Sequence, residues 1–198
     1  MQINILLMRK LSMDELNRKS VDEFKDAKKF PVIVILENIR SAYNVGSVFR
    51  TADAFLIESI FITGYTAKPP HKEITKTALG AQDSVDWHYF ETTKTAIEHL
   101  KKNQYKVYAV EQVSGSISLE NIADLSVDKI AFIFGNEVSG VDQEIILLCD
   151  GTIEIPQFGM KHSLNISVAA GIVLWEVARG VLITSKGVLL DKEGISKK

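Results

Sequence analysis

The sequence predicts an α/β fold with a mostly parallel sheet and helices on both faces. Short aliphatic runs alternate with helical patterns along most of the chain, which is typical of strand–helix–strand units. Two runs, residues 32–36 and 130–134, are continuously apolar, as expected for strands buried on both faces of a sheet. A length of 198 residues and a hydrophobic content of 46% are sufficient for one domain with a sizeable core.

The chain is predicted to have an arm, a main domain and a tail. Residues 1–30 form the arm, because alternating charges and irregularly spaced apolar residues over 11–29 indicate one or two surface helices. Pro31 marks the end of this arm. The main domain is expected over residues 31–183, and the polar residues 184–198 form the tail.

Within the main domain, the predicted strands and helices alternate. Strands are expected at residues 32–36, 59–63, 85–90, 106–110, 130–134 and 152–155, the third of them exposed or at a sheet edge. Helices are expected at residues 44–55, 93–103, 142–149 and 163–180. Residues 66–82 are interrupted by Pro69-Pro70 and are expected to form no regular element.

Composition narrows the classes of function. The net charge of −2 excludes a broadly basic nucleic-acid binder but leaves room for a local basic patch. The single cysteine, Cys149, cannot form an internal disulfide and is expected to be a buried structural thiol in a reducing compartment. No apolar segment reaches membrane-spanning length, and the four histidines lack metal-ligand spacing. These observations favour a cytoplasmic protein without a metal site.

The first candidate motif lies between a predicted buried strand and the helix that follows it. Asn44 can cap this helix, and Gly46 allows another backbone to approach closely. Arg50 lies almost two turns further on, at the edge of the apolar face. Its guanidinium either pairs with a carboxylate or holds a phosphate, which it can bind with two hydrogen bonds.

A second motif follows the strand at residues 130–134. Gly135 leads into Asn136 and Glu137, and Gly140 closes the turn. A purely structural turn does not need the charge of Glu137, so a functional loop is favoured over a plain turn. The spacings of the dinucleotide fingerprint and of the Walker phosphate loop are both absent.

The third motif opens the last helix. Ser163 is the predicted N-cap, and Asn165 is an unusual residue in a first helical turn. Unpaired backbone N–H groups and the helix dipole make this place suitable for a polar ligand, although an ordinary capped core helix would also fit.

Together, the three motifs resemble the SpoU/TrmH family of RNA ribose 2′-O-methyltransferases within the SPOUT superfamily. The resemblance covers roughly residues 31–180. The first motif is matched by Asn44, Gly46 and Arg50, and the second by Gly135, Asn136, Glu137 and Gly140. The third is matched by Ile155, Pro156, Gly159, Ser163, Leu164, Asn165, Ser167 and Ala169.

The resemblance implies a deep trefoil knot in the C-terminal part and S-adenosylmethionine as the cofactor. Cofactor contacts carry over to Gly135, Ile155 and Leu164, with Val110, Glu111 and Pro156 nearby. Catalytic roles carry over to Arg50, Asn44, Glu137, Ser163 and Asn165. Because a guanidinium stays protonated, Arg50 is expected to bind a substrate phosphate and polarise the hydroxyl, while phosphate or water accepts the proton.

The same resemblance implies an RNA substrate, with tRNA favoured over rRNA, and a homodimer. The RNA-binding candidates are the cluster Lys68, His71, Lys72 and Lys76, together with Arg40 near the motifs. A solvated loop explains the lysines equally well. Two rival functions stay open at this point, namely a non-catalytic RNA-binding module of the same fold and an oxidoreductase with a nicotinamide cofactor.

Overall fold

A computed structural model describes residues 9–12, 14–16, 18–125, 128–160 and 163–184 of the chain. Most of the predicted tail, residues 185–198, and the start of the arm, residues 1–8, lie outside the described residues. None of the helices in the described part is both long enough and apolar enough to cross a membrane.

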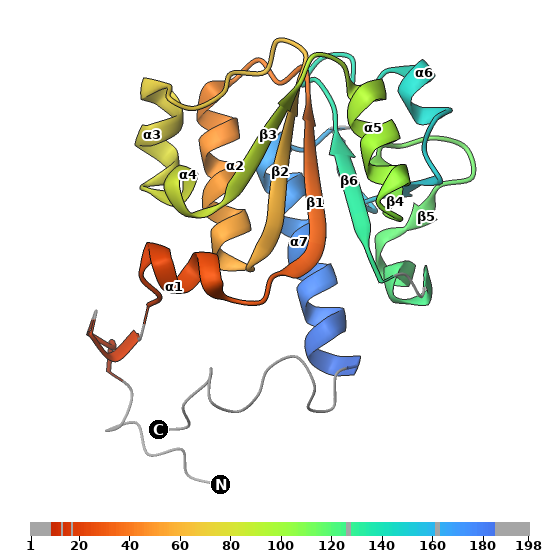
Figure 1. Cartoon of the computed structure of the whole chain (residues 1–198). Coiled ribbons are helices and arrows are strands. Elements are labelled where there is room, and N and C mark those ends of the chain that lie inside the picture. The colour runs from red at the N-terminus through yellow and green to blue at the C-terminus, as the bar shows by residue number, and fades with distance from the viewer. Residues whose placement is uncertain (1–8, 13, 17, 126–127, 161–162, 185–198) are drawn as a thin grey trace, which may run out of the picture.

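Seven strands form one sheet in which every pair is parallel (Figure 1). This confirms the predicted parallel sheet and adds a short strand at residues 117–118 to the six that were expected. The strands are β1 (Phe30–Glu37), β2 (Ile57–Thr63), β3 (Asp86–Phe90), β4 (Lys106–Val110), β5 (Ile117–Ser118), β6 (Ile130–Phe134) and β7 (Gly151–Glu154). Their order across the sheet is β3-β2-β1-β6-β4-β7-β5. The late strand β6 is therefore inserted between β1 and β4, and β3 lies at an edge, as its exposed residues predicted.

Helices cover both faces of the sheet. They are α1 (Val21–Asp26), α2 (Ala42–Ala54), α3 (Lys72–Ala78), α4 (Ala81–Ser84), α5 (Thr93–Lys102), α6 (Gln143–Ile146) and α7 (Ile166–Thr184), with 3-10 turns at Asp14–Leu16 and Leu119–Leu125. The α/β class and the two covered faces are confirmed.

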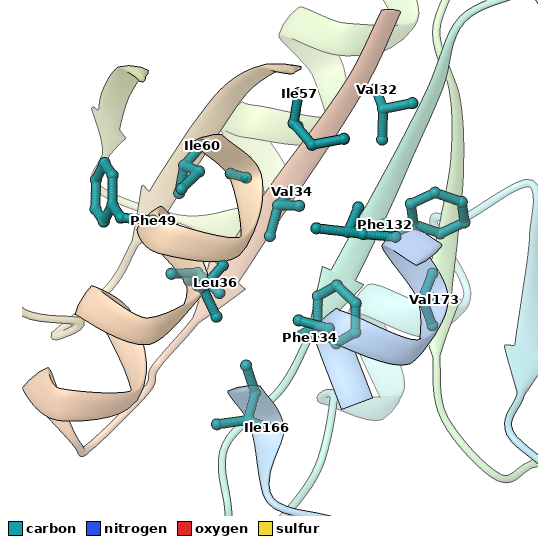
Figure 2. Close-up of a cluster of buried hydrophobic side chains, with 14 of the residues drawn as sticks. Val32, Val34, Leu36, Phe49, Ile57, Ile60, Phe132, Phe134, Ile166 and Val173 are labelled. Carbon is teal, nitrogen blue, oxygen red and sulfur yellow. The ribbon is translucent and has the colours of Figure 1, made fainter. Parts of the chain in front are cut away.

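One face of the sheet packs against α2 and α7. Alternate residues of β1, including Val34 and Leu36, point to this side and meet Phe49 of α2 and Val173 of α7 (Figure 2). Phe132 of β6 belongs to the same cluster. Successive side chains of a strand point to opposite faces, so the intervening β1 residues, such as Ile35, pack with α5 on the other side.

The structure corrects the expectation that residues 66–82 form no regular element. The helices α3 and α4 lie in this segment, and α3 packs closely against α2. His71 caps α3, since its Nδ1 accepts a hydrogen bond from the backbone N–H of Glu73 at 3.2 Å. Only Ile74 and Ala78 of α3 are buried, so the apolar pattern is too short to reveal a helix from sequence.

Two further differences concern the arm and α6. The segment predicted as an arm contains the helix α1, and Phe24 of this helix is only 4% exposed and belongs to the main core. Part of the arm is thus packed against the domain. The helix α6 ends at Ile146, earlier than the predicted residue 149, because Leu147–Cys149 continue as turns.

The parallel arrangement decides where a site can form. The carboxyl ends of β1, β6, β4 and β7 lie next to one another at one end of the sheet. In open parallel sheets the loops at this end bind ligands. All three predicted motifs begin at these strand ends.

Candidate active site

The amino end of α2 supplies the first polar group of the site. Ser41 caps this helix, because its hydroxyl oxygen accepts a hydrogen bond from the backbone N–H of Asn44 at 3.3 Å. The predicted cap at Asn44 is therefore wrong, and Asn44 lies in the first turn. Its side-chain amide is used for contacts outside the helix.

Glu137, in the loop after β6, joins that loop to the amino end of α2. Its Oε1 accepts hydrogen bonds from Asn44 Nδ2 at 3.1 Å and from the backbone N–H of Ser41 at 3.3 Å. Its Oε2 accepts a bond from the backbone N–H of Arg40 at 3.1 Å. A carboxylate is well suited to this position, since it can accept from several donors at once.

These bonds keep Glu137 ionised. Burial by itself raises the pKa of this carboxyl, but the backbone N–H of Arg40 and the other donors outweigh it, so the pKa is lowered overall. A negative charge is therefore fixed beside the helix amino end, where the helix dipole favours it.

Asn165 extends this network to the last helix. Its Nδ2 donates to Asn44 Oδ1 at 3.2 Å, and its Oδ1 accepts from the backbone N–H of Ser167 at 2.9 Å. The helix α7 begins at Ile166, so Asn165 is its cap and the prediction of a cap at Ser163 is wrong. The chain Glu137–Asn44–Asn165 links all three motifs.

The loop between Gly135 and Gly140 is closed too tightly for side chains at its ends. A Cβ on Gly135 would lie 2.2 Å from the carbonyl carbon of Gly140. Gly140 has a φ of +70°, and a Cβ there would meet Glu111 Oε2 at 2.1 Å. The same Oε2 accepts a bond from the backbone N–H of Val141 at 3.1 Å, so Glu111 holds the end of this loop.

A pocket of about 290 Å³ lies between these loops. Its lining comes from the ends of β4, β6 and β7 and from the start of α7, namely Val110, Glu111, Gln112, Phe134, Gly135, Asn136, Glu137, Val138, Ser139, Gly140, Glu154, Ile155, Gln157, Ser163, Leu164, Ile166 and Ala169. Among the described residues that line it, three are glutamates and none is a lysine or arginine. A ligand with positive charge suits this surface.

Most of the predicted cofactor residues meet at this pocket. The structure brings together Val110, Glu111, Gly135, Ile155 and Leu164, and adds the predicted catalytic residues Glu137 and Ser163. Pro156 is not part of the described lining, although its neighbours Ile155 and Gln157 are. Asn44 donates a hydrogen bond to Glu137, and Asn165 donates one to Asn44, so both asparagines border the pocket.

Three residues that contribute to this site were not predicted from the sequence. Asn136 belongs to the second motif, and its Oδ1 accepts hydrogen bonds from the backbone N–H groups of Val138 and Ser139, which shapes the loop. Ser41 could have been found as a capping residue before an apolar helical pattern. Glu154 lies within a predicted strand, and no local pattern marks it as part of a pocket.

Arg50, the remaining predicted catalytic residue, lies outside this pocket. Its side chain is exposed on α2 and lines a second hollow of about 670 Å³ with residues of the arm and of α4, including Arg18, Lys19 and Ser84. A single chain therefore does not bring Arg50 into the pocket with Glu137.

The RNA-binding candidates gather around the start of α3. The ammonium of Lys68 lies 3.7 Å from the ring centroid of Tyr89, and that of Lys76 lies 5.6 Å from the ring centroid of Tyr43. Lys72 is exposed on α3, and His71 caps it. Arg40 is exposed beside the pocket, where its backbone N–H bonds Glu137.

Comparison with known families gives a match over most of the chain. The model of the SpoU rRNA methylase family matches residues 31–175. A relative from Aquifex aeolicus, named tRNA (guanosine(18)-2′-O)-methyltransferase, is 29% identical over 164 residues, which are 81% of this chain and 75% of the relative.

Solved structures have the same fold. The A. aeolicus TrmH/SpoU tRNA modifying enzyme superimposes with a TM-score of 0.73 at 24% identity, over 82% of this chain and 81% of that one. An S-adenosylmethionine-bound rRNA methyltransferase from Sinorhizobium meliloti superimposes with a TM-score of 0.70 at 27% identity. That match covers 82% of this chain and 61% of the other.

Proposed function

The chain belongs to the SpoU rRNA methylase family, and on that basis we propose that it transfers a methyl group from S-adenosylmethionine to a ribose 2′-hydroxyl of RNA. The observation that carries this proposal is the hydrogen-bonded chain Glu137–Asn44–Asn165 beside the pocket. It unites the three motifs on which the family resemblance rests.

The pocket fits the cofactor chemically. S-adenosylmethionine carries a sulfonium and an ammonium group and supplies the methyl group when bound. The carboxylates of Glu111, Glu137 and Glu154 favour such a ligand, whereas they disfavour the pyrophosphate of a nicotinamide dinucleotide. We expect Gly135, Ile155 and Leu164 to hold the cofactor, with Pro156 shaping the segment between the last two.

The residues around the pocket then have distinct roles. Glu137 fixes the loop after β6 against α2, and Asn44 and Asn165 position the ribose beside the pocket. Ser163 lines the pocket, and we expect its hydroxyl to contact the sugar. We assign to Arg50 the binding of a phosphate next to the target nucleotide, and to that phosphate or to water the acceptance of the hydroxyl proton. Alignment of the reacting atoms supplies much of the rate.

The role of Arg50 requires a second copy of the chain or an RNA that reaches both places. We propose a homodimer formed through α7, because Val168, Ile172 and Trp175 form an apolar stripe with helical spacing that is exposed in the single chain. A partner chain would cover this stripe and bring its Arg50 toward the pocket. We also propose that the C-terminal part of the domain is threaded as the trefoil knot of the superfamily.

The favoured substrate is tRNA, with rRNA as the alternative. Support comes from the name of the A. aeolicus relative, which resembles this chain over most of both lengths. Arg40, Lys68, His71, Lys72 and Lys76 are the proposed phosphate contacts. Their contribution would be sensitive to salt, because phosphate binding releases counterions. We also propose that the reaction takes place in the cytoplasm.

A methyl-transfer assay with labelled S-adenosylmethionine and bulk tRNA tests the proposal. The product is expected to carry label that survives alkaline hydrolysis as a dinucleotide, because a 2′-O-methyl group blocks cleavage of the adjacent phosphodiester. Glu98→Gln, on the exposed face of α5, is the control variant and should retain full activity. Binding of both RNA and cofactor without transfer would instead identify a non-catalytic RNA-binding module.

A further inference from the structure

The loop after β2 presents an exposed aromatic ring at the border of the pocket. Tyr65 is 63% exposed, although its backbone N–H and its hydroxyl both make hydrogen bonds. Its backbone N–H donates to Asn38 Oδ1 at 3.3 Å, and its hydroxyl oxygen accepts a bond from Asn136 Nδ2 at 2.5 Å. The ring is therefore fixed in place while its surface faces solvent.

Asn136 connects this ring to the active site. It lines the pocket, and its Nδ2 also donates to the backbone oxygen of Asn38 at 2.9 Å. A ligand that extends out of the pocket along this side would meet Tyr65 directly. Tyr65 lies in none of the three motifs, and the family resemblance gives it no role.

A cation is oriented on the same loop. The ammonium of Lys68 lies over the ring of Tyr89, 3.7 Å from its centroid. Tyr89 is itself anchored, since its hydroxyl donates to the backbone oxygen of Gly64 at 3.2 Å. The loop thus combines an accessible ring at Tyr65 with a positioned charge at Lys68, whereas the pocket beside it is lined by carboxylates.

This combination matches unpaired RNA rather than a duplex. Proteins that bind single-stranded nucleotides place bases on aromatic rings and phosphates on lysine or arginine. A base within a duplex is stacked on both faces and cannot meet such a ring. The contrast in charge also directs phosphates to the loop and away from the pocket.

We propose that Tyr65 stacks on an unpaired base that neighbours the methylated nucleotide, and that Lys68 binds a phosphate of the same segment. The inference rests on the proposed function, because it assumes an RNA substrate. It adds that the target lies in an unpaired segment of that RNA.

The test compares two substitutions of Tyr65 in the full chain. Tyr65→Phe keeps the ring and removes the hydroxyl, whereas Tyr65→Leu keeps apolar volume and removes the ring. The dissociation constant for bulk tRNA, measured by filter binding, is expected to change less than about twofold for Phe and to rise roughly 5- to 150-fold for Leu, the range found for loss of one stacked base. Equal losses in both variants, or no loss in Leu, would overturn the proposal.

Lys68→Ala has a matched control in Lys102→Ala, an exposed lysine at the carboxyl end of α5. Only the Lys68 variant is expected to weaken RNA binding and to reduce its dependence on salt. Equal effects of the two changes would contradict a phosphate site at Lys68. Calorimetry with S-adenosylmethionine should give unchanged affinity in all four variants, which separates this inference from a failure of the cofactor assignment.

A second measurement covers the case in which Tyr65→Leu does not fold. Tyr65→Trp introduces a fluorescent ring at the same position, and stacking on a base quenches indole emission. A single-stranded oligonucleotide should quench this emission, whereas a duplex of the same sequence should not. Quenching by both to the same extent, or by neither, would refute stacking by this residue. Absence of methyl transfer by the wild-type chain, with quenching retained in Tyr65→Trp, would refute the proposed function alone.

Discussion

Asn165 donates a hydrogen bond from its side-chain Nδ2 to Oδ1 of Asn44 across a separation of 121 residues, with the two atoms 3.2 Å apart. The same Asn165 caps α7, and the same Asn44 donates to Glu137. One pair of amides therefore aligns two helix ends and the loop that closes the pocket.

The two functions of Asn165 can be separated by substitution. Asn165→Asp keeps an oxygen to cap α7 but removes the donor to Asn44. We expect near-normal stability and a loss of methyl transfer of roughly tenfold or more, equivalent to about 1.4 kcal/mol. Asn165→Ala removes the cap as well and should also lower the free energy of unfolding by about 1 kcal/mol. Urea titration and initial rates check both values, and full activity in the Asp variant would contradict the role of this bond.

Mixing two inactive variants tests whether Arg50 acts on the partner's pocket. Arg50→Ala and Asn165→Asp should each be nearly inactive alone. If Arg50 works across a dimer, co-refolded mixtures contain heterodimers with one intact site, so activity should recover to about one quarter of wild type. No recovery, with heterodimers verified by a tag, would place Arg50 on the same chain's substrate.

Gly46 lies at the contact between α2 and α3, and Gly171 in α7 provides the control for its substitution. A Cβ at Gly46 would lie 2.1 Å from Thr77 Oγ1 and 2.4 Å from the backbone oxygen of Ile74, so α3 would have to move. Gly46→Ala should cost on the order of 1–3 kcal/mol in the free energy of unfolding. Within the single chain nothing lies within 4 Å of a Cβ at Gly171 in α7, so Gly171→Ala should leave the packing of the chain intact and be neutral or stabilising by up to about 1 kcal/mol for the monomer. Similar urea midpoints for the two variants would be inconsistent with this packing.

The titration of Glu37 should lower the free energy of unfolding as the pH rises. The residue is 2% exposed at the end of β1, and burial raises its pKa despite bonds from Thr93 and from the backbone N–H of Asp142. Between the unfolded pKa of about 4.3 and the higher folded value, the native state holds more protons than the unfolded state. The stability contributed by this group is therefore lost as pH rises through that window.

Glu37→Gln is the variant that checks this titration. It should flatten the pH dependence above about pH 4.3 and leave stability at pH 7 equal to or higher than that of wild type. Urea unfolding at a series of pH values from about pH 4.3 upward measures the difference. An unchanged profile for Glu37→Gln would contradict the shift.

Cys149 is expected to be unreactive in the folded protein. Burial raises the pKa of this thiol to about 12, and its Sγ donates to the backbone oxygen of Ile145 at 3.3 Å. Because the thiolate is the reactive form, a disulfide reagent at neutral pH should label the native chain slowly and the urea-unfolded chain rapidly. Rapid labelling of the native chain would show that the thiol is accessible.

Much of the fold could be predicted because its strands are simple patterns. Residues 32–36 and 130–134 are buried on both faces, so their sequence is uniformly apolar and can be recognised as a strand without knowledge of its neighbours. The helix α3 could not be predicted, since its buried face consists of two residues next to prolines and lysines. Local composition there reflects the surface rather than the packing.

The site shows the same division. The motifs identified Glu137, Asn44 and Asn165 as site residues. They did not predict that Ser41 and Asn165 cap the two helices, because the first residue of each helix depends on the path of the preceding loop. Tyr65 contacts Asn136 although β1 separates β2 from β6 in the sheet, so the loop after β2 and the loop after β6 meet across the end of β1. Contacts of this kind belong to the tertiary structure and have no local signal.

The insertion of β6 between β1 and β4 also sets a condition on biosynthesis. A ribosome delivers β1 to β4 well before residues 130–134 emerge, so the early strands of a nascent chain lack the strand that joins them. The two halves of the sheet can be united only late in translation. Premature termination upstream of β6 should therefore yield fragments that expose apolar sheet edges, which are substrates for chaperones and proteases.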